Sequence, residues 1–247
     1  MNVRCYLDST YLKTALQAGI SDMDNINIVE YCVREAIEEQ FKLVMIRPEF
    51  VAIAKEIIMQ SNSRVLVGTV IDFPSGDHSL NFKLQEAQSA IAAGADELDF
   101  VIDYKSFLKG DLNIVKQQVL ECSRLVLQNN RTIKWIIEVA ALNATQIIQI
   151  TTLIKNVIIA NFKEDVYDSV FVKSSTGFFT KNDGSIGVAT IDDIKLILEN
   201  AFPLPVKAAG GVRSYEDVVT LLVLGVKRIG TSVAKAIADA APTNTDY

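Results

Sequence analysis

Short apolar runs rich in β-branched residues recur along the chain and predict β-strands. Eight such runs are present: CYLDS (5–9), KLVMI (42–46), RVLVGTVI (64–71), ELDFVI (97–102), TIKWIIEV (132–139), SVFVKSS (169–175), PVKAA (205–209) and KRIGT (227–231). Between these runs, apolar residues return every three or four positions, as at Ile28, Cys32 and Ala36, which predicts helices. Strands and helices therefore alternate along the whole chain.

This alternation predicts a parallel sheet built from βαβ units, an α/β fold. Eight units in 247 residues match the length of about 250 residues typical of a (β/α)8 TIM barrel. An open doubly wound sheet is the alternative that the pattern leaves open. Because no glycine- or serine-rich linker divides the chain, we expect a single barrel domain over residues 1–247, with a flexible C-terminal tail over residues 241–247.

Composition and charge narrow the class of protein. With 49% hydrophobic residues, the chain is expected to fold around a large core. The net charge of −6 leaves no basic stripe for a nucleic-acid backbone, and no apolar run reaches the ~18–20 residues of a membrane span. We therefore expect no nucleic acid and no membrane as partner. The start of the sequence lacks the apolar core of a signal peptide, which predicts a cytoplasmic protein.

Cysteine and histidine usage limits the possible chemistry. Cys5, Cys32 and Cys122 are odd in number and lack metal-type spacing, so reduced thiols are the simplest interpretation. His78 is the single histidine and is interpreted as a polar loop residue. One histidine excludes histidine-rich metal sites and most Ser-His or Cys-His nucleophile systems. Catalysis is therefore expected to rest on other groups.

Two lysines stand at the ends of otherwise apolar strands. Lys173 follows three apolar residues in VFVKSSTG, and Lys207 has the corresponding place one strand later in PVKAAGGVR. Two inward ammonium groups on neighbouring strands would repel by about 3 kcal/mol, or roughly two pKa units. One lysine would then lose its proton, which is the activation that an amine nucleophile requires. The alternative is a lysine that extends to the barrel rim.

Two aspartates are candidate partners of these lysines. Alternate strands of a barrel contribute side chains to the same interior layer. This layering places Asp99 of ELDFV with Lys173, and Asp8 of YLDST with Lys207. Asp99 could then move protons for the amine while Asp8 holds Lys207 charged, unless either aspartate is a loop or helix-cap residue.

Glycines after the last strands predict a phosphate site. Loops after strands seven and eight of barrels often bind phosphate through backbone N–H groups and a helix N-terminus. The candidate phosphate-binding residues are Gly177, Gly210, Gly211, Gly230 and Ser232, with Thr176 and Arg213 as further candidates. Glycine pairs are also common in turns, and Arg213 could equally lie on the surface.

Two further charged residues, in the fifth predicted strand, have no settled role. Glu138 could be an acid at the barrel mouth or a rim residue, and Lys134 of the same strand is equally open. Trp135, between them, is expected to be a core or helix-facing residue.

The motifs together resemble the deoxyribose-phosphate aldolase family. They are YLDSTYLK, GTVIDFPSG, GADELDFVI, FVKSSTGF, VKAAGGVRSYEDV and RIGTS, and they occur in the family's order over nearly the whole chain. The combination of FVKSSTG with VKAAGGVR some thirty residues later is the most specific part of the resemblance.

The resemblance implies a class I aldolase, a lyase, that needs no metal and no organic cofactor. Its implied reaction is the reversible cleavage of 2-deoxy-D-ribose 5-phosphate into acetaldehyde and D-glyceraldehyde 3-phosphate, a step of deoxyribonucleotide catabolism. Lys173 is the implied Schiff-base residue, Lys207 the activating lysine, Asp99 the proton-relaying acid and Asp8 its support. The expected partners are these small molecules, and a homo-oligomer is a candidate assembly.

The sequence departs from the family pattern at a few positions. Met45 stands in the second strand where many members carry a cysteine, so a reactive thiol is absent there and better survival in aldehyde is expected. Val233 replaces a small polar residue of the common GTSSG motif. The terminal Tyr247 is similar to the tyrosine that ends some members, where it could assist proton transfer at the enamine carbon, or it could belong to a disordered tail.

Two competing functions remain open. One is another class I barrel aldolase that acts on a different phosphorylated sugar. The other is a binding or regulatory barrel that kept the fold and lost catalysis.

Overall fold

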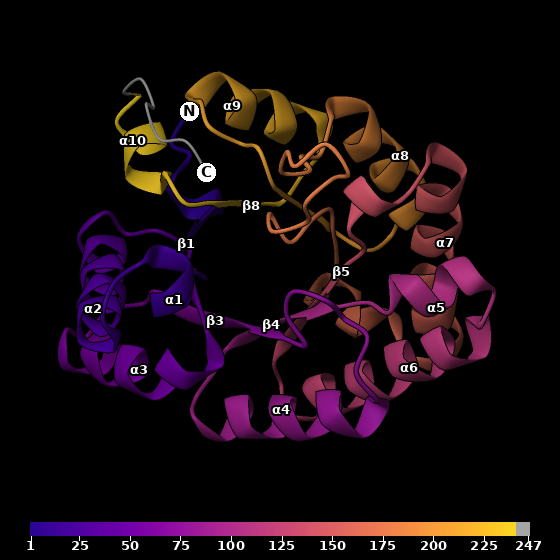
Figure 1. Ribbon diagram of the computed structural model, residues 1–247, viewed down its shortest axis with the longest axis horizontal. Coiled ribbons are helices and arrows are strands. Elements are labelled where there is room, and N and C mark those ends of the chain that lie inside the picture. Colours follow the sequence, from indigo (N-terminus) through magenta and orange to yellow (C-terminus); the bar gives the residue numbers. More distant parts are fainter. Residues whose placement is uncertain (241–247) are drawn as a thin grey trace.

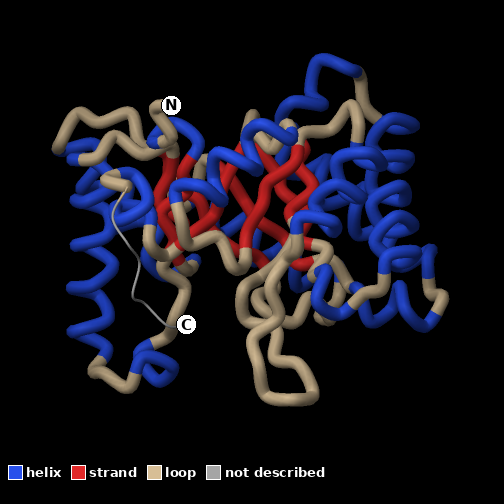
Figure 2. The backbone as a smooth tube through the Cα atoms, turned by 90° about the horizontal axis from the view of Figure 1, so that it is seen from above, coloured by secondary structure: helices blue, strands red, loops and turns tan. Residues whose placement is uncertain are grey.

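A computed structural model describes residues 1–240 and shows a closed barrel of parallel strands (Figures 1 and 2). Within these residues the strands are β1 (Leu7–Thr10), β2 (Leu43–Ile46), β3 (Leu66–Ile71), β4 (Glu97–Val101), β5 (Thr132–Ile136), β6 (Val170–Lys173), β7 (Val206–Ala209) and β8 (Arg228–Thr231). They pair in sequence order, and β1 closes the barrel against β8. The predicted barrel is therefore confirmed, and the open sheet is excluded.

Helices surround the barrel as an outer layer (Figure 1). The described α-helices are α1 (Ala15–Ala18), α2 (Asp22–Glu38), α3 (Val51–Gln60), α4 (Leu80–Ala92), α5 (Tyr104–Lys109), α6 (Leu112–Gln128), α7 (Ala144–Asn161), α8 (Ile191–Ala201), α9 (Tyr215–Leu224) and α10 (Ala234–Ala238). Short 3-10 helices span Arg4–Tyr6, Pro48–Phe50, Val139–Ala141 and Glu164–Ser169. None of the helices in residues 1–240 combines the length and apolarity needed to cross a membrane.

Polar side chains fix where several helices begin. Thr14, Asn143, Thr190 and Ser214 each accept a hydrogen bond from the backbone three residues later, and the side chain at that later position bonds back to the backbone of the cap. Such reciprocal capping satisfies N–H groups that the helix itself leaves unpaired. These caps therefore define the residues at which α1, α7, α8 and α9 begin.

The main hydrophobic core lies between the barrel and the helices. Along β4 and β5, Leu98, Phe100, Ile133 and Trp135 point outwards into this core and are fully buried. The Trp135 indole nitrogen donates a hydrogen bond to the Ser123 hydroxyl at 3.1 Å, so its one polar atom is satisfied by α6. Trp135 is thus a helix-facing residue, as its apolar character predicted.

The barrel interior is divided into an apolar part and a charged part. Leu43 and Met45 of β2 and Val70 of β3 form a small apolar cluster inside the barrel. A side chain at Gly68 would come within 2.6 Å of the Met45 Cε atom, so the glycine makes room for this cluster. Strands β4 to β8 and β1 instead contribute charged residues to the interior, and these form the candidate site.

Candidate active site

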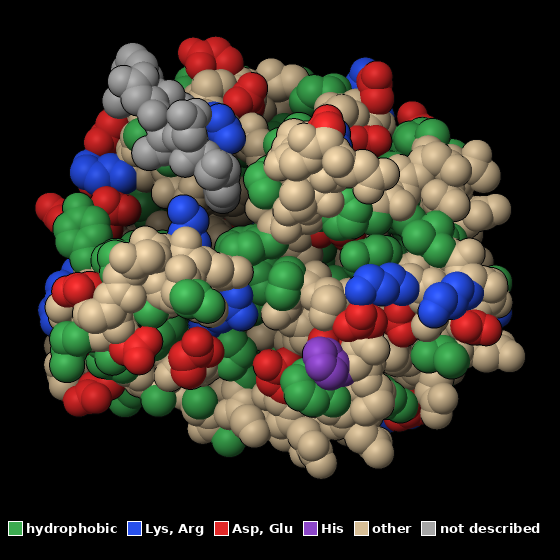
Figure 3. Space-filling model, in the orientation of Figure 1, with side chains coloured by type: hydrophobic (Ala, Val, Ile, Leu, Met, Phe, Trp, Pro, Cys, Tyr) green, Lys and Arg blue, Asp and Glu red, His purple; other side chains and the backbone are tan. Residues whose placement is uncertain are grey.

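The candidate site lies where the carboxyl ends of the strands meet the following loops. Lys173, the last residue of β6, borders a cavity of about 220 Å3 that is also lined by residues 10–13, 176–178, 209–210 and 230–233. Figure 3 shows the face viewed in Figure 1 with its side chains, hollowed towards the middle. A larger hollow of about 960 Å3 lies outside the barrel between α5, α6 and α7, and contains none of the predicted site residues.

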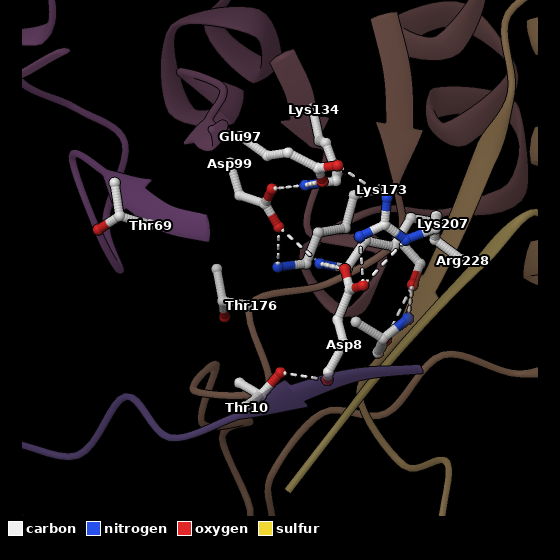
Figure 4. A network of polar contacts seen from close by, with 12 residues as sticks. Asp8, Thr10, Thr69, Glu97, Asp99, Lys134, Lys173, Thr176, Lys207 and Arg228 are labelled. Atoms are coloured by element: carbon white, nitrogen blue, oxygen red, sulfur yellow. Dashed lines mark hydrogen bonds and ion pairs between the residues drawn. The ribbon is translucent and has the colours of Figure 1, made fainter. Parts of the chain in front are cut away.

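The two predicted lysines lie side by side. Lys173 and Lys207 are paired positions on β6 and β7, and their side chains are 3% and 0% exposed. Each Nζ donates a hydrogen bond to the same oxygen, Asp99 Oδ2, at 2.9 Å (Figure 4). The structure therefore places both lysines inside the barrel, and neither extends to the rim.

Both predicted aspartates are buried next to these lysines. Asp99 contacts Lys173, as the layering argument predicted, and also contacts Lys207. Asp8 Oδ2 forms an ion pair with Lys207 Nζ at 2.6 Å. Asp8 lies within β1 and Asp99 within β4, and both carboxylates are 0% exposed, so neither is a loop or cap residue.

Three charged residues that sequence reasoning left out or left open belong to the same cluster. Lys134 Nζ lies 2.6 Å from Asp99 Oδ1 and 2.6 Å from Glu97 Oε2. Arg228 lies 2.9 Å from Glu97 Oε1, and its Nε donates to Asp8 Oδ1 at 2.9 Å. Residues two apart on a strand face the same side, so Glu97 could have been found from Asp99. Arg228 could have been found in the same way, two positions before Gly230.

Burial is the main reason for an unusual pKa at Lys173. Burial lowers the pKa, the Asp99 carboxylate opposes this change, and the Lys207 ammonium group adds to it. The net result is a pKa that falls from 10.5 to about 8. The expectation that repulsion from Lys207 would be the chief cause is corrected: desolvation of the ammonium group is larger. At pH 7 roughly a tenth of the amine would be neutral, against less than ~0.1% for an ordinary lysine.

Asp99 is held in its ionised form. Burial alone would raise the pKa of its carboxyl group, but the ammonium groups of Lys134, Lys173 and Lys207 outweigh burial and hold the pKa well below its usual value. A carboxylate next to a partly neutral amine can accept a proton from it and return that proton later.

Glu138 supports the loop that follows β6. It is buried in a left-handed backbone conformation with φ of 56°, and its Oε2 accepts hydrogen bonds from the backbone N–H and the hydroxyl of Thr176. Thr176 Oγ1 in turn accepts from the Phe178 N–H at 3.0 Å. Burial raises the pKa of Glu138. Glu138 is therefore neither a rim residue nor part of the cavity lining. It holds Thr176 in place, and Thr176 lines the cavity.

The predicted phosphate residues gather around two adjoining cavities. Gly177, Gly210, Gly230 and Ser232 line the cavity of Lys173. Gly211 and Arg213 line a second cavity of about 270 Å3, to which Gly177 and Gly210 also contribute. The predicted Tyr247 and the tail 241–247 lie outside the described residues.

The glycine pair after β7 has a backbone that favours glycine. Gly210 and Gly211 have φ of 86° and 92°, and a side chain at Gly211 would come within 2.9 Å of Val188. Gly230 leaves room for the Lys207 side chain, because a side chain at Gly230 would lie 3.1 Å from the Lys207 Cε atom. Helix α10, which follows β8, has only five residues.

Comparison with known proteins decides the family. The model of the DeoC/LacD family aldolases matches residues 8–234, most of the chain. The chain belongs to this aldolase family. It is a class I aldolase, a lyase.

Full-length relatives support the assignment to the DeoC/LacD family. The deoxyribose-phosphate aldolase of Thermococcus gammatolerans is 34% identical over 98% of this chain and 97% of its own length. A solved structure of a putative deoxyribose-phosphate aldolase from Coccidioides immitis is 27% identical, covers 96% of this chain and 85% of that one, and has a TM-score of 0.78. Deoxyribose phosphate aldolase from Aeropyrum pernix, described as having a unique tetrameric structure, is 27% identical, covers 96% and 89%, and has a TM-score of 0.76.

The departures from the family pattern have defined places in this aldolase. Met45 is fully buried in the apolar cluster inside the barrel, so no thiol stands at that position. Val233 lines the cavity of Lys173 next to Ser232 and offers it an apolar surface. The thiols of Cys32 and Cys122 are shielded, and burial raises their pKa to about 11 and about 12.

One group of the aldolase could hold a metal by distance alone. Asp72, Asp77 and His78 converge in the loop after β3, where His78 Nδ1 lies 2.5 Å from Asp72 Oδ1. Lys83 forms an ion pair with Asp72 at 2.6 Å, and Lys105 forms one with Asp77 at 2.6 Å. The carboxylates of this group thus already have cationic partners. His78 lies in a loop, as the sequence predicted.

Proposed function

We propose that this aldolase catalyses the reversible cleavage of 2-deoxy-D-ribose 5-phosphate into acetaldehyde and D-glyceraldehyde 3-phosphate. The reaction proceeds through a Schiff base on Lys173. The observation that carries the proposal is the placement of Lys173: a buried amine with a pKa of about 8, bordering a cavity and bonded to an ionised carboxylate. The substrate is supported by the name deoxyribose-phosphate aldolase, which full-length relatives at 32–34% identity carry.

In the synthetic direction, the neutral amine of Lys173 attacks the carbonyl carbon of acetaldehyde. The proton that the nitrogen loses passes by way of the Asp99 carboxylate to the former carbonyl oxygen, and the product is a neutral carbinolamine. Asp99 then passes a second proton, taken up from solvent, to the carbinolamine hydroxyl, which leaves as water and gives a positively charged imine. Asp99 Oδ2, 2.9 Å from Lys173 Nζ, is placed for both transfers.

The imine then serves as an electron sink. Loss of a proton from the carbon next to the imine gives a neutral enamine, and that carbon attacks the aldehyde of glyceraldehyde 3-phosphate. A new carbon–carbon bond forms, the former aldehyde oxygen takes up the proton that was lost from that carbon, and the positively charged imine returns. Water hydrolyses the imine, which releases the deoxysugar phosphate and restores Lys173.

Lys207 and Asp8 prepare the site in this scheme. Lys207 disfavours a second positive charge on Lys173, and it shares the Asp99 oxygen with that amine. Asp8 lies 2.6 Å from Lys207 Nζ, so Lys207 has a second anionic partner, which Lys173 lacks among the described ion pairs. Lys173, whose pKa is lowered, is therefore the lysine that becomes the nucleophile.

The phosphate of the substrate is assigned to the glycine loops. Gly177, Gly210, Gly211, Gly230 and Ser232 supply backbone N–H groups and one hydroxyl around the two adjoining cavities. Thr176 and Arg213 border the same region. Binding the phosphate there would hold the acceptor aldehyde in line with the enamine carbon.

Reductive trapping tests the proposed function. The enzyme is incubated with acetaldehyde and borohydride and then digested, and the masses of its peptides are measured by mass spectrometry. A two-carbon adduct on Lys173 is expected, whereas an adduct on Lys207 would reverse the assignment, and no adduct would favour a non-catalytic barrel. Lys173→Ala should abolish turnover. Lys195→Ala, which removes an exposed lysine on α8, is the matched control and should leave turnover unchanged.

Substrate competition tests which sugar is used. Deoxyribose 5-phosphate is expected to be cleaved in preference to other phosphorylated sugars of similar length. If a different sugar phosphate is cleaved preferentially, the Schiff-base mechanism stands but the proposed substrate is wrong.

We further propose that the chain acts as a single barrel domain, in the cytoplasm, and as a homo-oligomer. The Aeropyrum pernix relative, whose structure is described as tetrameric, supports an oligomer. The free thiols at Cys5, Cys32 and Cys122 support a reducing compartment. Size-exclusion chromatography with light scattering measures the assembly, and a mass of one chain would contradict an oligomer.

A further inference from the structure

The ion pairs of the barrel interior close into a ring (Figure 4). Going round it, each carboxylate contacts two cations and each cation contacts two carboxylates. The order is Asp8, Lys207, Asp99, Lys134, Glu97, Arg228 and back to Asp8. The separations between Asp8 and Glu97, going by way of Lys207, Asp99 and Lys134, are 2.6, 2.9, 2.6 and 2.6 Å. The members come from β1, β4, β5, β7 and β8, so the ring is a property of the closed barrel.

The charges of this ring cancel. It contains the three carboxylates and three cations just named, all with side chains no more than 7% exposed. Lys173 lies outside the ring and is attached to it through Asp99 alone among the described ion pairs. A protonated Lys173 therefore adds one positive charge to an interior that is otherwise neutral. Because an unbalanced buried charge destabilises the folded protein, the neutrality of the ring favours the neutral form of the Lys173 amine.

The other surroundings of Lys173 do not supply a balancing charge. On the β2 and β3 side, Leu43, Met45 and Val70 present an apolar surface inside the barrel. Glu138, after β5, is a further carboxyl group that interacts electrostatically with Lys173. Burial raises the pKa of Glu138, and its Oε2 is engaged by Thr176. The neutral ring thus remains the main electrostatic setting of the amine.

We propose that Glu97, Lys134 and Arg228 are positioning residues that keep the barrel interior neutral and thereby keep Lys173 ready to lose its proton. The inference rests on the proposed function, in which Lys173 is the nucleophile. It goes beyond the pair of lysines, because it makes the reactivity of Lys173 depend on the total charge of residues that do not border the cavity. Removing a cation from the ring and removing an anion from it should then have opposite effects.

The test is the pH dependence of adduct formation at Lys173 with acetaldehyde and borohydride. The neutral amine reacts, so the trapping rate falls as the pH drops through the pKa of Lys173. Lys134→Met leaves the ring with one excess negative charge, which favours the ammonium form and should move the midpoint up by about one pH unit. Glu97→Gln leaves one excess positive charge and should move it down by a similar amount. The double variant restores neutrality and should return the midpoint to that of the wild type.

A matched control separates ring charge from total charge. Asp96→Asn removes an anion one residue before Glu97, where Asp96 binds Lys55 and Arg131 outside the ring. Its midpoint should equal that of the wild type. Should Lys134→Met fail to fold in a thermal unfolding assay, Glu97→Gln and the double variant carry the test alone.

The outcomes are distinct. A midpoint that stays constant in all folded variants, or that shifts in the same direction when a cation and when an anion is removed, overturns the inference. Failure of the proposed function looks different, because the wild type would then form no adduct on Lys173 at any pH.

Discussion

Lys173 and Lys207 donate hydrogen bonds to one and the same oxygen, Asp99 Oδ2, from paired positions on neighbouring strands. A single carboxylate oxygen that serves two ammonium groups cannot fully stabilise both charges. The lysine with a second anionic partner is Lys207, which also contacts Asp8. The asymmetry between the two lysines thus arises from their partners, and several consequences can be measured.

Lys207→Met should lower activity at neutral pH in a way that alkali partly reverses. The substitution removes one cation beside Asp99, so the pKa of Lys173 should rise above about 8. The neutral fraction at pH 7, and with it kcat, should then fall by about tenfold or more. A pH profile of kcat measures this. A decrease in kcat by the same factor at every pH would indicate structural damage instead.

Lys173→Met should stabilise the fold at neutral pH. The lowered pKa of Lys173 means that the unfolded chain binds a proton more readily between about pH 8 and 10.5, so this group destabilises the folded state below pH 8 and ceases to do so above 10.5. Replacing the ammonium by an apolar group of similar length should raise the free energy of unfolding at pH 7 by about 1–3 kcal/mol.

Lys207→Met is the comparison for that measurement. It leaves Asp8 and Asp99 short of a partner, so it should lower the free energy of unfolding by about 3 kcal/mol. Denaturant unfolding at pH 7 and at pH 10 checks both variants. Equal destabilisation by the two substitutions would contradict the view that only Lys173 carries an unbalanced charge.

Asp99→Asn should slow proton transfer without removing the nucleophile. The asparagine is close to the aspartate in shape, but it cannot take the proton of the attacking amine. General acid–base groups typically contribute factors of about 10²–10⁴, so kcat should fall within that range. Mass analysis after borohydride trapping should still find the adduct on Lys173 after long incubation. Near-normal kcat would remove Asp99 from the proton path.

Gly211→Ala tests the assignment of the phosphate. Gly211 has φ of 92°, and an added side chain would come within 2.9 Å of Val188, so the loop must shift. The KM for deoxyribose 5-phosphate should rise about tenfold, while cleavage of unphosphorylated deoxyribose should change little. Gly225→Ala is the control, because Gly225 also has a positive φ, of 111°, but ends α9 away from both cavities. Equal effects on both substrates would contradict a phosphate role.

Met45→Cys should make the enzyme more sensitive to aldehyde. The substitution places a thiol inside the barrel next to Leu43 and Val70. Residual activity after incubation in concentrated acetaldehyde should fall faster than in the wild type. Cys5→Ser, which removes an exposed thiol, serves as control and should not change survival. Rapid inactivation of the wild type itself in concentrated acetaldehyde would contradict the prediction.

The fold was predictable because its signals are local. Each predicted strand overlaps an observed one; the run at 205–209, for example, is observed as Val206–Ala209. The pairing of Lys173 with Lys207 was also accessible, since they have equivalent places in consecutive strands of a parallel barrel. Periodicity and strand order carry this information without any side-chain detail.

The charge ring was not predictable in the same way. Arg228 and Glu97 are 131 positions apart, and their contact depends on how far each side chain reaches across the barrel. Lys134 was noticed, but its direction could not be decided without knowing that Asp99 and Glu97 both face it. The cause of the pKa shift of Lys173 was misjudged for a related reason, because repulsion can be computed from strand spacing whereas the degree of burial cannot.

The division of the barrel interior into an apolar and a charged part has a consequence for directed evolution of this enzyme. The apolar cluster of Leu43, Met45 and Val70 adjoins the cavity through Leu12 and Phe178, and substitutions that conserve volume there should be tolerated one at a time. A substitution in the charged ring alters the charge around Lys173 unless a partner of opposite sign changes with it. A library intended to broaden the range of accepted aldehydes is therefore best confined to the apolar wall, where single steps remain viable.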